Sequence, residues 1–452
     1  MSRLLLKNAL IVTGTTSFNG CLGIEGERIS GIWKKEPEGF EASGAIDLGG
    51  KILIAGGIDA HVHFRDPGLT WKADIGSESE SALLGGITSF IDMPNTKPPT
   101  ISIEALEEKS MTASLKSRAN YGFHLGATNT NVSLIKEYLD AGMAVRFAGI
   151  KVFMGSSTGN MLVDNDMSLN ELFKIGKKPI LVHCEDEGII RANMEAAAKT
   201  YGDSIPFSMH PRIRSREACI KSTGKAIRMA LEYGTALHIL HVSTKEEIEM
   251  IREAKVHNPK ITAETSPNYL WFCDKDYGRL QGKVKCNPAI KSDADRQALR
   301  QALAEGVIDT IGSDHAPHLV TEKEEPYLKC PSGIPSVRES LPVLLTVARE
   351  CGIPLERLAE VFSENPARIF GIKDRGFLKE GFFADLVVID PDGITVPAGS
   401  GYKCGWTPYE GIALKGSVDM VWINGELAVS ASKPSAATGR CRPRPLLFQS
   451  IG

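Results

Sequence analysis

The sequence lacks the features that mark several classes of protein. Its nine cysteines include no Cys-x-x-Cys pair, which argues against a zinc–thiolate site and a disulfide framework and favours a reducing cytoplasm. No apolar run approaches the length of a membrane span. At the N-terminus, Lys7 interrupts a short apolar stretch, and no cleavage signature follows it. A net charge of only −3 gives no reason to expect nucleic acid or a membrane surface as partner. The composition therefore leaves a small-molecule substrate, either neutral or anionic, as the expected ligand.

The chain is long enough for a large domain with a small companion. It has 452 residues, and α/β barrels commonly reach about 250 residues or more as single units. Its hydrophobic content of 42% is that of a globular protein. We therefore expect one large domain and one small one.

The middle of the chain repeats a pattern of apolar strand, turn and amphipathic helix. We predict strands near 58–63, 87–92, 121–127, 147–153, 179–184, 236–242, 260–265 and 308–313, and helices that include 102–116, 186–200, 216–233, 292–305, 336–351 and 355–363. Eight strands close a (β/α)8 TIM-type barrel. Ser243-Thr-Lys-Glu246 has a capping-box pattern, which predicts that a helix begins directly after His241.

Both ends of the chain have β patterns. Short strands separated by Gly and Asn turns precede the barrel, and β signals return after about residue 370. We predict that residues 1–54 and 371–452 pair into one small β-sandwich domain, and that residues 55–370 form the barrel. Two unrelated extensions are the alternative, which would leave two sets of edge strands to protect. The last dozen residues are basic and predict a loosely packed terminus, with a binding tail as the alternative.

The motif His61-Val-His63 stands at the end of an apolar run and is followed by Phe64 and Arg65. Residues i and i+2 of a strand point to the same face, so the two imidazoles can hold one metal ion. The candidate site therefore begins at this strand.

Other polar residues recur at the carboxyl ends of the predicted strands, where barrel enzymes have their active sites. They are Lys151, His183, His241 and Asp314. Singly, each histidine fits a hydrogen-bonded structural role and the aspartate fits a helix cap. Together, four imidazoles and a carboxylate suit zinc or a similar divalent cation, because so many buried polar groups need partners.

The remaining histidines favour structural roles. His238 is three residues from His241, so strand alternation predicts opposite faces for the two. We expect His241 to be the ligand and His238 to pack in the core. His124 and His257 have the same structural interpretation, and His210 lies in a loop that the pattern does not place.

Lys151 lies inside the apolar run Phe-Ala-Gly-Ile-Lys-Val-Phe-Met. A lysine in such a run commonly extends its ammonium group to water. A cation beside divalent metal ions would be strongly repelled. Reaction with carbon dioxide would instead give a carbamate, whose negative charge and two oxygens could bridge two metal ions, and burial favours this by lowering the amine pKa.

These motifs resemble those of the dihydroorotases, a cyclic amidohydrolase family of the amidohydrolase superfamily. The resemblance covers nearly the whole chain. It is carried by Asp-Ala-His-Val-His-Phe-Arg-Asp-Pro-Gly (59–68), Asp-Met-Pro-Asn-Thr (92–96), Ile-Lys-Val-Phe (150–153), Val-His-Cys-Glu-Asp (182–186), Leu-His-Val-Ser (240–243), Cys-Asn-Pro-Ala (286–289), Gly-Ser-Asp-His-Ala-Pro-His (312–318) and Ser-Glu-Asn-Pro-Ala-Arg (363–368).

The resemblance implies a binuclear zinc site. It implies that His61, His63 and Asp314 hold one ion, that His183 and His241 hold the other, and that carboxylated Lys151 bridges them. A metal-bridged hydroxide would attack the ring amide, with Asp314 moving the proton to the departing nitrogen. The implied reaction is the reversible cyclisation of N-carbamoyl-L-aspartate to L-dihydroorotate in pyrimidine biosynthesis.

The resemblance also implies which residues bind the substrate. Arg65, Asn95 and His318 would hold the ring carboxylate, because a guanidinium can give a carboxylate two parallel hydrogen bonds. Asn287 and the backbone around Gly333 would contact the ring. Thr158, in the polar stretch 155–160, would belong to a closing lid, with an ordinary surface turn as the alternative. A surface role for Arg65 and a turn role for Asn95 are the structural alternatives.

Three other functions share much of this pattern. An allantoinase or a dihydropyrimidinase (hydantoinase) would have the same metal ligands, but its substrate has no ring carboxylate for Arg65. A non-catalytic scaffold would usually lack several ligand residues, whereas all six are present here. A homodimer is the default assembly that we expect.

Overall fold

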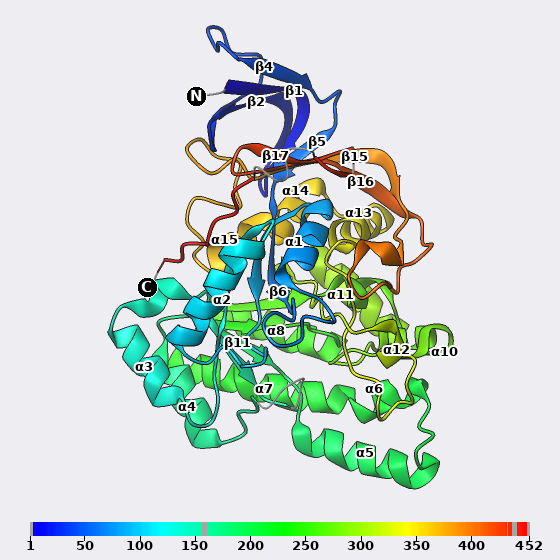
Figure 1. Ribbon diagram of the computed structural model, residues 1–452. Helices are drawn as coiled ribbons and strands as arrows, with labels where there is room; N and C mark the ends of the chain where they lie inside the picture. The colour runs from blue at the N-terminus through cyan, green and yellow to red at the C-terminus, as the bar shows by residue number, and fades with distance from the viewer. Residues whose placement is uncertain (1–2, 156–160, 432, 436–440, 450–452) are drawn as a thin grey trace.

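The computed structural model describes residues 3–155, 161–431, 433–435 and 441–449. Figure 1 shows a strand-and-helix barrel with a β domain on one side, where the blue N-terminal strands lie beside the orange and red C-terminal ones. Within these residues, no helix has the length and apolar character needed to cross a membrane.

The β domain is built from strands of both chain ends. Its strands are β1 (Arg3–Val12), β2 (Ser17–Glu25), β3 (Arg28–Trp33), β4 (Gly44–Asp47), β5 (Ile52–Ala55), β15 (Leu386–Thr395), β16 (Leu414–Ile423), β17 (Glu426–Ser430) and β18 (Lys433–Pro434). They form one hydrogen-bonded sheet in the order β18-β17-β16-β15-β5-β1-β2-β3, with β4 paired to β1. The joint is β5, which runs parallel to β1 and antiparallel to β15. The prediction that the two termini pair, rather than extend separately, is confirmed.

The barrel strands follow one another along the chain as predicted. They are β6 (Gly57–Val62), β7 (Ile87–Asp92), β8 (Asn120–Phe123) continued by β9 (Leu125–Gly126), β10 (Ile150–Phe153), β11 (Ile180–His183), β12 (Leu237–Ile239), β13 (Ile261–Thr265) and β14 (Thr310–Ile311). All paired neighbours are parallel. A parallel bridge from Val62 to His315 joins the first strand to the segment after the last. This arrangement confirms the predicted TIM-type barrel.

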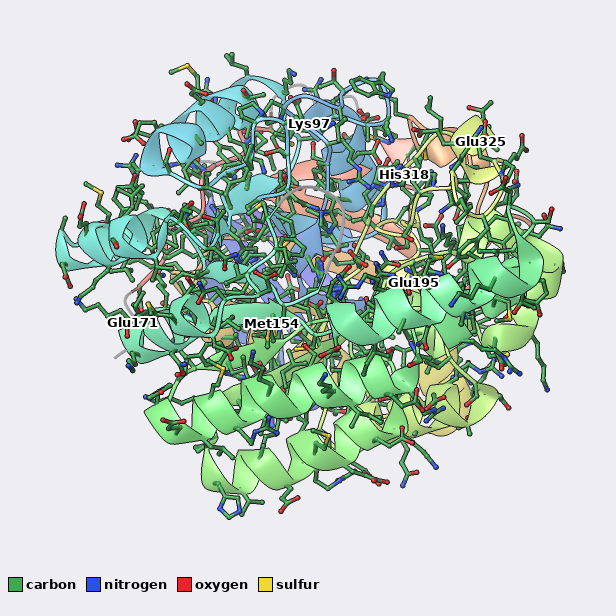
Figure 2. All side chains as sticks on the ribbon, turned by 90° about the horizontal axis from the view of Figure 1, so that it is seen from below. Lys97, Met154, Glu171, Glu195, His318 and Glu325 are labelled. Atoms are coloured by element: carbon green, nitrogen blue, oxygen red, sulfur yellow. The ribbon has the colours of Figure 1, made fainter. Side chains whose placement is uncertain are left out.

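Helices cover the outside of the barrel, and Figure 2 shows several of them packed around the strands. They are α1 (Ile75–Leu84), α2 (Ile103–Lys116), α3 (Val132–Asp140), α4 (Asp166–Ile175), α5 (Glu187–Tyr201), α6 (His210–Ile213), α7 (Arg216–Tyr233), α8 (Lys245–His257), α9 (Pro267–Trp271), α10 (Tyr277–Leu280), α11 (Asp293–Ala304), α12 (Val320–Lys323), α13 (Ser340–Cys351), α14 (Leu355–Ala359) and α15 (Asn365–Ile369). Short 3-10 helices are η1 (Met143–Arg146), η2 (Phe207–Met209), η3 (Asp274–Asp276), η4 (Gln281–Val284) and η6 (Gly399–Gly401), and η5 (Glu360–Glu364) is a π-helix.

Two predicted helix starts need correction. The cap of α8 is Thr244 with Glu247, one residue later than the predicted Ser243 with Glu246, because the Thr244 side chain accepts from the Glu247 backbone. Helix α13 begins at Ser340 rather than 336, because the backbone N–H groups of Ser336 and Val337 donate to the His315 ring instead. Polar side chains thus decide both boundaries.

The C-terminal segment is packed, contrary to the prediction of a loose terminus. The backbone N–H of Tyr121, in barrel strand β8, donates to Arg444, and the N–H of Leu446 donates back to Tyr121. Leu446 and Phe448 are buried against the barrel. Their apolar surface therefore anchors residues 441–449 to the barrel rather than to the terminal sheet.

Candidate active site

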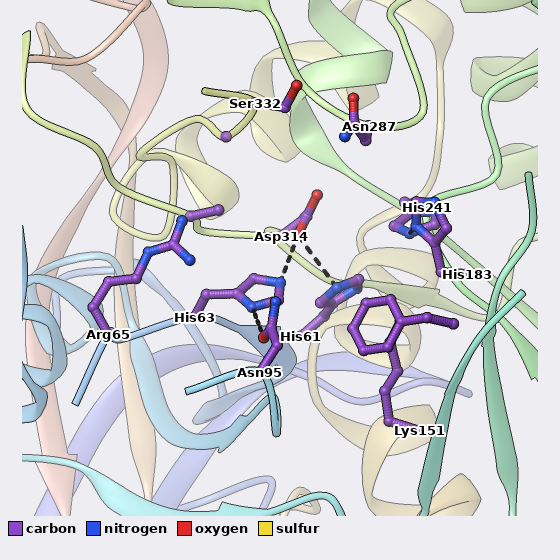
Figure 3. A pocket seen from close by; sticks show the side chains of 13 residues that line it. His61, His63, Arg65, Asn95, Lys151, His183, His241, Asn287, Asp314 and Ser332 are labelled. Atoms are coloured by element: carbon purple, nitrogen blue, oxygen red, sulfur yellow. Dashed lines mark hydrogen bonds and ion pairs between the residues drawn. The ribbon is translucent and has the colours of Figure 1, made fainter. Parts of the chain in front are cut away.

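One cavity at the carboxyl ends of the barrel strands gathers most of the candidate residues (Figure 3). It is lined by His61, His63, Arg65, Asn95, Lys151, Phe153, His183, His241, Asn287, Asp314, Ala316, Ser332 and Gly333. His318 lies directly behind Arg65, and Thr158 lies outside the described residues. Residues from six strand ends and their loops therefore converge as the sequence predicts.

His61, His63 and Asp314 form a group that could hold a metal ion. Their ligand atoms lie within 4.8 Å of one another. Asp314 Oδ1 is 3.3 Å from Nε2 of His61 and 3.1 Å from Nε2 of His63. Burial raises the pKa of Asp314, but His61 and His63 outweigh burial and the net shift is downward. Asp314 is therefore an ionised ligand candidate.

Hydrogen bonds to Nδ1, the ring nitrogen that points away from Asp314, fix the orientation of the His61 and His63 imidazoles. Nδ1 of His61 is 2.6 Å from Glu264 Oε1, and Nδ1 of His63 is 2.7 Å from Asn95 Oδ1. Both contacts place the proton on Nδ1 and leave Nε2 to face Asp314, as a metal-ligating histidine requires. Burial lowers the pKa of His63 to about 4, so this ring is neutral and able to coordinate.

His183 and His241 form the second half of the cluster. Their ring nitrogens, Nδ1 of His183 and Nε2 of His241, are 2.9 Å apart. His183 Nε2 contacts Glu185 Oε2 at 3.0 Å, and Arg214 pairs with the same carboxylate. Burial lowers the pKa of both histidines. Two neutral imidazoles thus turn nitrogen atoms toward a common point, on the opposite side of the cavity from Arg65 (Figure 3).

Lys151 is a buried amine with no ion-pair or hydrogen-bond partner in the described part of the chain. Its side chain, on β10, is only 1% exposed, and Nζ lies 4.5 Å from the centre of the Phe153 ring. Burial lowers the pKa of Lys151 to about 7, with Asp314 and Glu264 acting in the opposite direction. The amine does not extend to water, which was the structural alternative.

The cluster fits a metal centre on its own geometry. Nδ1 of His241 is buried and has no hydrogen-bond partner within the described ranges. Two histidine nitrogens face each other at 2.9 Å, and Lys151 is unpaired beside them. A divalent cation between the rings would give both Nδ1 of His183 and Nε2 of His241 a partner, whereas Nδ1 of His241 points away from such an ion and is not explained by it.

Three of the cavity residues have left-handed backbone conformations. The φ angles are 64° at Arg65, 40° at His241 and 48° at Asp314. Such angles are uncommon for residues other than glycine and gather at functional sites. At each position the chain has just left its strand, and the turn directs the side chain to the cavity.

The other side of the cavity is cationic. Arg65 is 3% exposed; its Nε donates to the Pro317 carbonyl at 3.1 Å, and Nη2 lies 3.1 Å from His318 Nε2. No carboxylate of the described residues forms an ion pair with it. Burial lowers the pKa of Arg65 only to about 10, so it stays charged. Lys72 contacts Nδ1 of His318 from behind, at 2.9 Å.

Backbone and amide groups complete this wall. Oδ1 of Asn287 is buried without a partner among the described residues. Gly333 has a φ of 147°, and a Cβ there would meet the Ala316 carbonyl at 2.4 Å, so the segment can approach the cavity only as glycine. Lys323 Nζ donates to the carbonyls of Lys285, Pro331 and Gly333, which fixes both segments.

His238 and His124 have structural partners, although one argument about His238 was wrong, and His257 is exposed on the surface. His238 contacts Thr262 at 2.8 Å and lies 3.7 Å from Glu264, inside the barrel. It does not face away from His241, because the strand ends at Ile239 and the alternation ends with it. His124 contacts the Ala60 carbonyl at 2.9 Å.

His210, which the sequence did not place, lies between Tyr327 and the Cys286 carbonyl, each at 2.8 Å. Its burial and its two partners give it a structural role.

Sequence reasoning missed the groups that orient the site. Glu264 is fully buried on β13; burial would raise its pKa, but His61 and His238 lower it to about 2. Glu185 and Lys72 were missed as well. Glu264 could have been predicted from the sequence, because it is a charged residue near the end of an apolar strand, as His183 is. The contact between Lys72 and His318 could not have been predicted, because the two residues are 246 positions apart in the sequence.

Comparison with known proteins gives concordant matches. The sequence pattern of the Amidohydrolase family matches residues 52–428. The chain is 35% identical to a dihydroorotase of Methanosarcina acetivorans, over 81% of this chain and 79% of that protein. It is 29% identical to an allantoinase of Streptomyces avermitilis, over 98% of both. The structure of an L-hydantoinase (dihydropyrimidinase) from Arthrobacter aurescens superposes with a TM-score of 0.90 at 29% identity, covering 96% of this chain and 98% of that one.

Proposed function

This chain belongs to the amidohydrolase family, and on that premise we propose that it is a dihydroorotase, which reversibly cyclises N-carbamoyl-L-aspartate to L-dihydroorotate in pyrimidine biosynthesis. The observation that carries the proposal is Arg65, a buried guanidinium that lines the cavity and has no carboxylate partner among the described residues. A buried charge without a counter-ion is costly, and a substrate carboxylate would supply one.

The metal half of the cavity supports a hydrolase that acts on a cyclic amide. We propose that His61, His63 and Asp314 bind one zinc ion, that His183 and His241 bind a second, and that Lys151 bridges them as a carbamate. Bound zinc would supply an activated water and a Lewis acid for the amide carbonyl. The burial of Lys151 and its lack of a partner favour the carbamate, because an ammonium would be repelled there.

The side chains around this centre have separate tasks in the proposal. Asp314 accepts the proton of the attacking water and delivers it to the ring nitrogen that departs, since its carboxylate faces the centre of the cavity. Glu264 and Asn95 hold the imidazoles in place.

The opposite wall would orient the ring. Arg65 binds the ring carboxylate, with His318 beside it and Asn95 at the edge, and Asn287 Oδ1 accepts a ring N–H. The backbone near Gly333 lies against the ring. Thr158 remains a lid candidate from the sequence.

The competing functions predict a different set of residues on the Arg65 side of the cavity. Hydantoins and allantoin have no ring carboxylate, so they would leave the buried charge of Arg65 without a carboxylate partner. A non-catalytic scaffold does not need the buried imidazoles and amine to converge on one point. Both alternatives therefore fit the cavity less well than a carboxylated ring does.

One set of assays tests the proposal. The zinc-loaded protein is incubated with N-carbamoyl-L-aspartate, L-dihydroorotate, hydantoin and allantoin, with a chelator-treated sample as the control. We expect turnover of the first two compounds, lost with the chelator and restored by zinc. Preference for hydantoin or allantoin would overturn the assignment, and no turnover of any compound would favour the scaffold.

We also propose a division of labour and a setting for the enzyme. Residues 55–370 carry the chemistry, while 1–54 and 371–452 form the supporting β domain and a tail, of which residues 441–449 pack against the barrel. The absence of any disulfide among the cysteines fits the cytoplasm. A homodimer is the proposed assembly, and light scattering after gel filtration would measure it.

A further inference from the structure

Lys72 is a buried lysine just outside the cavity. Its Nζ lies 2.9 Å from Nδ1 of His318 and 2.7 Å from Oε1 of Glu322. Oε2 of Glu322 also lies 3.8 Å from Nδ1 of His318, which is too far for a hydrogen bond, so the Lys72 ammonium is the hydrogen-bond partner of this nitrogen. An ammonium group only donates hydrogen bonds, so Nδ1 of His318 must accept. The remaining proton of a neutral His318 ring then lies on Nε2.

The other ring nitrogen of His318 faces the carboxylate side of the cavity. Nε2 is 3.1 Å from the Ser332 carbonyl and 3.1 Å from Nη2 of Arg65. With a proton on Nε2, His318 donates to the carbonyl and cannot accept from Arg65. The pKa of His318 is lowered to about 3, by burial first and then by Arg65, which keeps the ring neutral.

The opposite tautomer would change the role of Arg65. With the proton on Nδ1, Nε2 becomes an acceptor 3.1 Å from the guanidinium. Arg65 would then donate one N–H to His318 and present one N–H fewer to a ligand. The position of one proton therefore decides how many N–H groups this wall presents to an anion.

We propose that Lys72 is a positioning residue that determines substrate specificity: by donating to Nδ1, it holds His318 as an Nε2–H donor and leaves the Arg65 guanidinium to the substrate carboxylate. This inference rests on the proposed function, and Lys72 itself does not line the cavity.

The contacts separate this role from a general structural one. The backbone of His318 is held independently, because the Trp406 indole donates to its carbonyl at 2.7 Å. Figure 2 shows His318 nearer the middle of the molecule than Glu325, on the same side of the barrel. Removing the ammonium should thus change the tautomer of His318 without releasing its segment.

The test compares Lys72→Met with Glu322→Gln as the matched control. Glu322 is the other partner of Lys72 and its side chain is 31% exposed, so loss of its charge should matter little. For N-carbamoyl-L-aspartate we expect Lys72→Met to raise KM roughly 10-fold or more and to change kcat less than about 3-fold. Glu322→Gln should keep KM within about 3-fold of wild type.

A second measurement reads the tautomer directly. In protein labelled with 15N-histidine, the His318 resonances are assigned by their loss in His318→Gln. Wild type should show an unprotonated Nδ1 and a protonated Nε2, and Lys72→Met should shift this pattern. A wild-type His318 protonated at Nδ1 would overturn the inference even if Lys72→Met failed to fold.

The outcomes distinguish the two levels of the proposal. An active wild-type enzyme whose Lys72→Met variant keeps its KM for N-carbamoyl-L-aspartate would overturn the role of Lys72 alone. A wild type that ignores N-carbamoyl-L-aspartate but hydrolyses neutral rings would overturn the proposed function and the specificity role together.

Discussion

The two walls of the cavity are built in different ways. On one wall, which we call the strand wall, His61, Lys151 and His183 belong to barrel strands, while His241 and Asp314 come directly after β12 and β14. Buried carboxylates contact His61 and His183 from the side away from the cavity. On the other wall, Arg65 and His318 come from loops and contact carbonyls, a lysine and each other. The strand wall offers ligands for cations and the loop wall offers donors for an anion. The comparison teaches that reaction chemistry can reside in the barrel frame while substrate choice resides in its loops.

The largest effect should come from the strand wall. Asp314→Asn removes the proposed proton carrier and a metal ligand, so kcat should fall about 1,000-fold or more for every cyclic amide tested. Steady-state assays with N-carbamoyl-L-aspartate and with any neutral ring that the wild type accepts would measure this. If kcat fell only for N-carbamoyl-L-aspartate and not for neutral rings, the strand wall would also determine substrate choice, and the distinction between the two walls would be wrong.

Lys151→Ala should be the next most severe change. Without the proposed bridge, bound zinc should fall by about half and kcat by on the order of 100-fold. Elemental analysis of the purified variant, with wild type loaded in the same way, checks the metal content. An unchanged zinc content would contradict the bridging role, and restored activity with bicarbonate in wild type reloaded from the apo-protein would support it.

Arg65→Met sharpens the comparison from the other wall. Truncating a buried charged hydrogen-bond donor costs about 2–3 kcal/mol, so kcat/KM for N-carbamoyl-L-aspartate should fall roughly 30- to 150-fold. Zinc content should stay at the wild-type level, because among the described residues Arg65 forms no hydrogen bond with Asp314 or with the four histidines proposed as metal ligands. Equal losses of zinc and activity would show that the walls are not separable.

Glu264→Gln should have the smallest effect of the four. The amide can still contact Nδ1 of His61, but the negative charge behind the ring is lost. Zinc affinity should fall about 10-fold, with a modest change in KM, as for other groups that orient a ligand from behind. Competition with a fluorescent chelator measures the affinity. An unchanged affinity would mean that Glu264 serves the barrel interior alone.

The strand wall was predictable because its residues are local signals. An apolar run that ends in a polar residue identifies a barrel strand and its active end together, which located His61, His183 and Lys151. The loop wall was predictable only in part. Arg65 follows His63 directly, but its neighbour His318 is 253 positions away, and only the fold brings them together.

Two kinds of information were absent from the pattern. His241 and Asp314 lie beyond the ends of their strands and have positive φ angles. The alternation of side chains along a strand therefore no longer predicts which way these two residues point. This is why the argument that set His238 opposite His241 failed. Paired buried charges such as Glu185 with Arg214 depend on tertiary packing, which periodicity does not encode.

A crystal structure of the zinc-loaded protein with L-dihydroorotate tests the central claim most directly. The account predicts the ring carboxylate within hydrogen-bond distance of the Arg65 guanidinium and His318 Nε2, with the ring amide on the side of Asp314. A ring bound with its carboxylate elsewhere, and Arg65 unengaged, would contradict it.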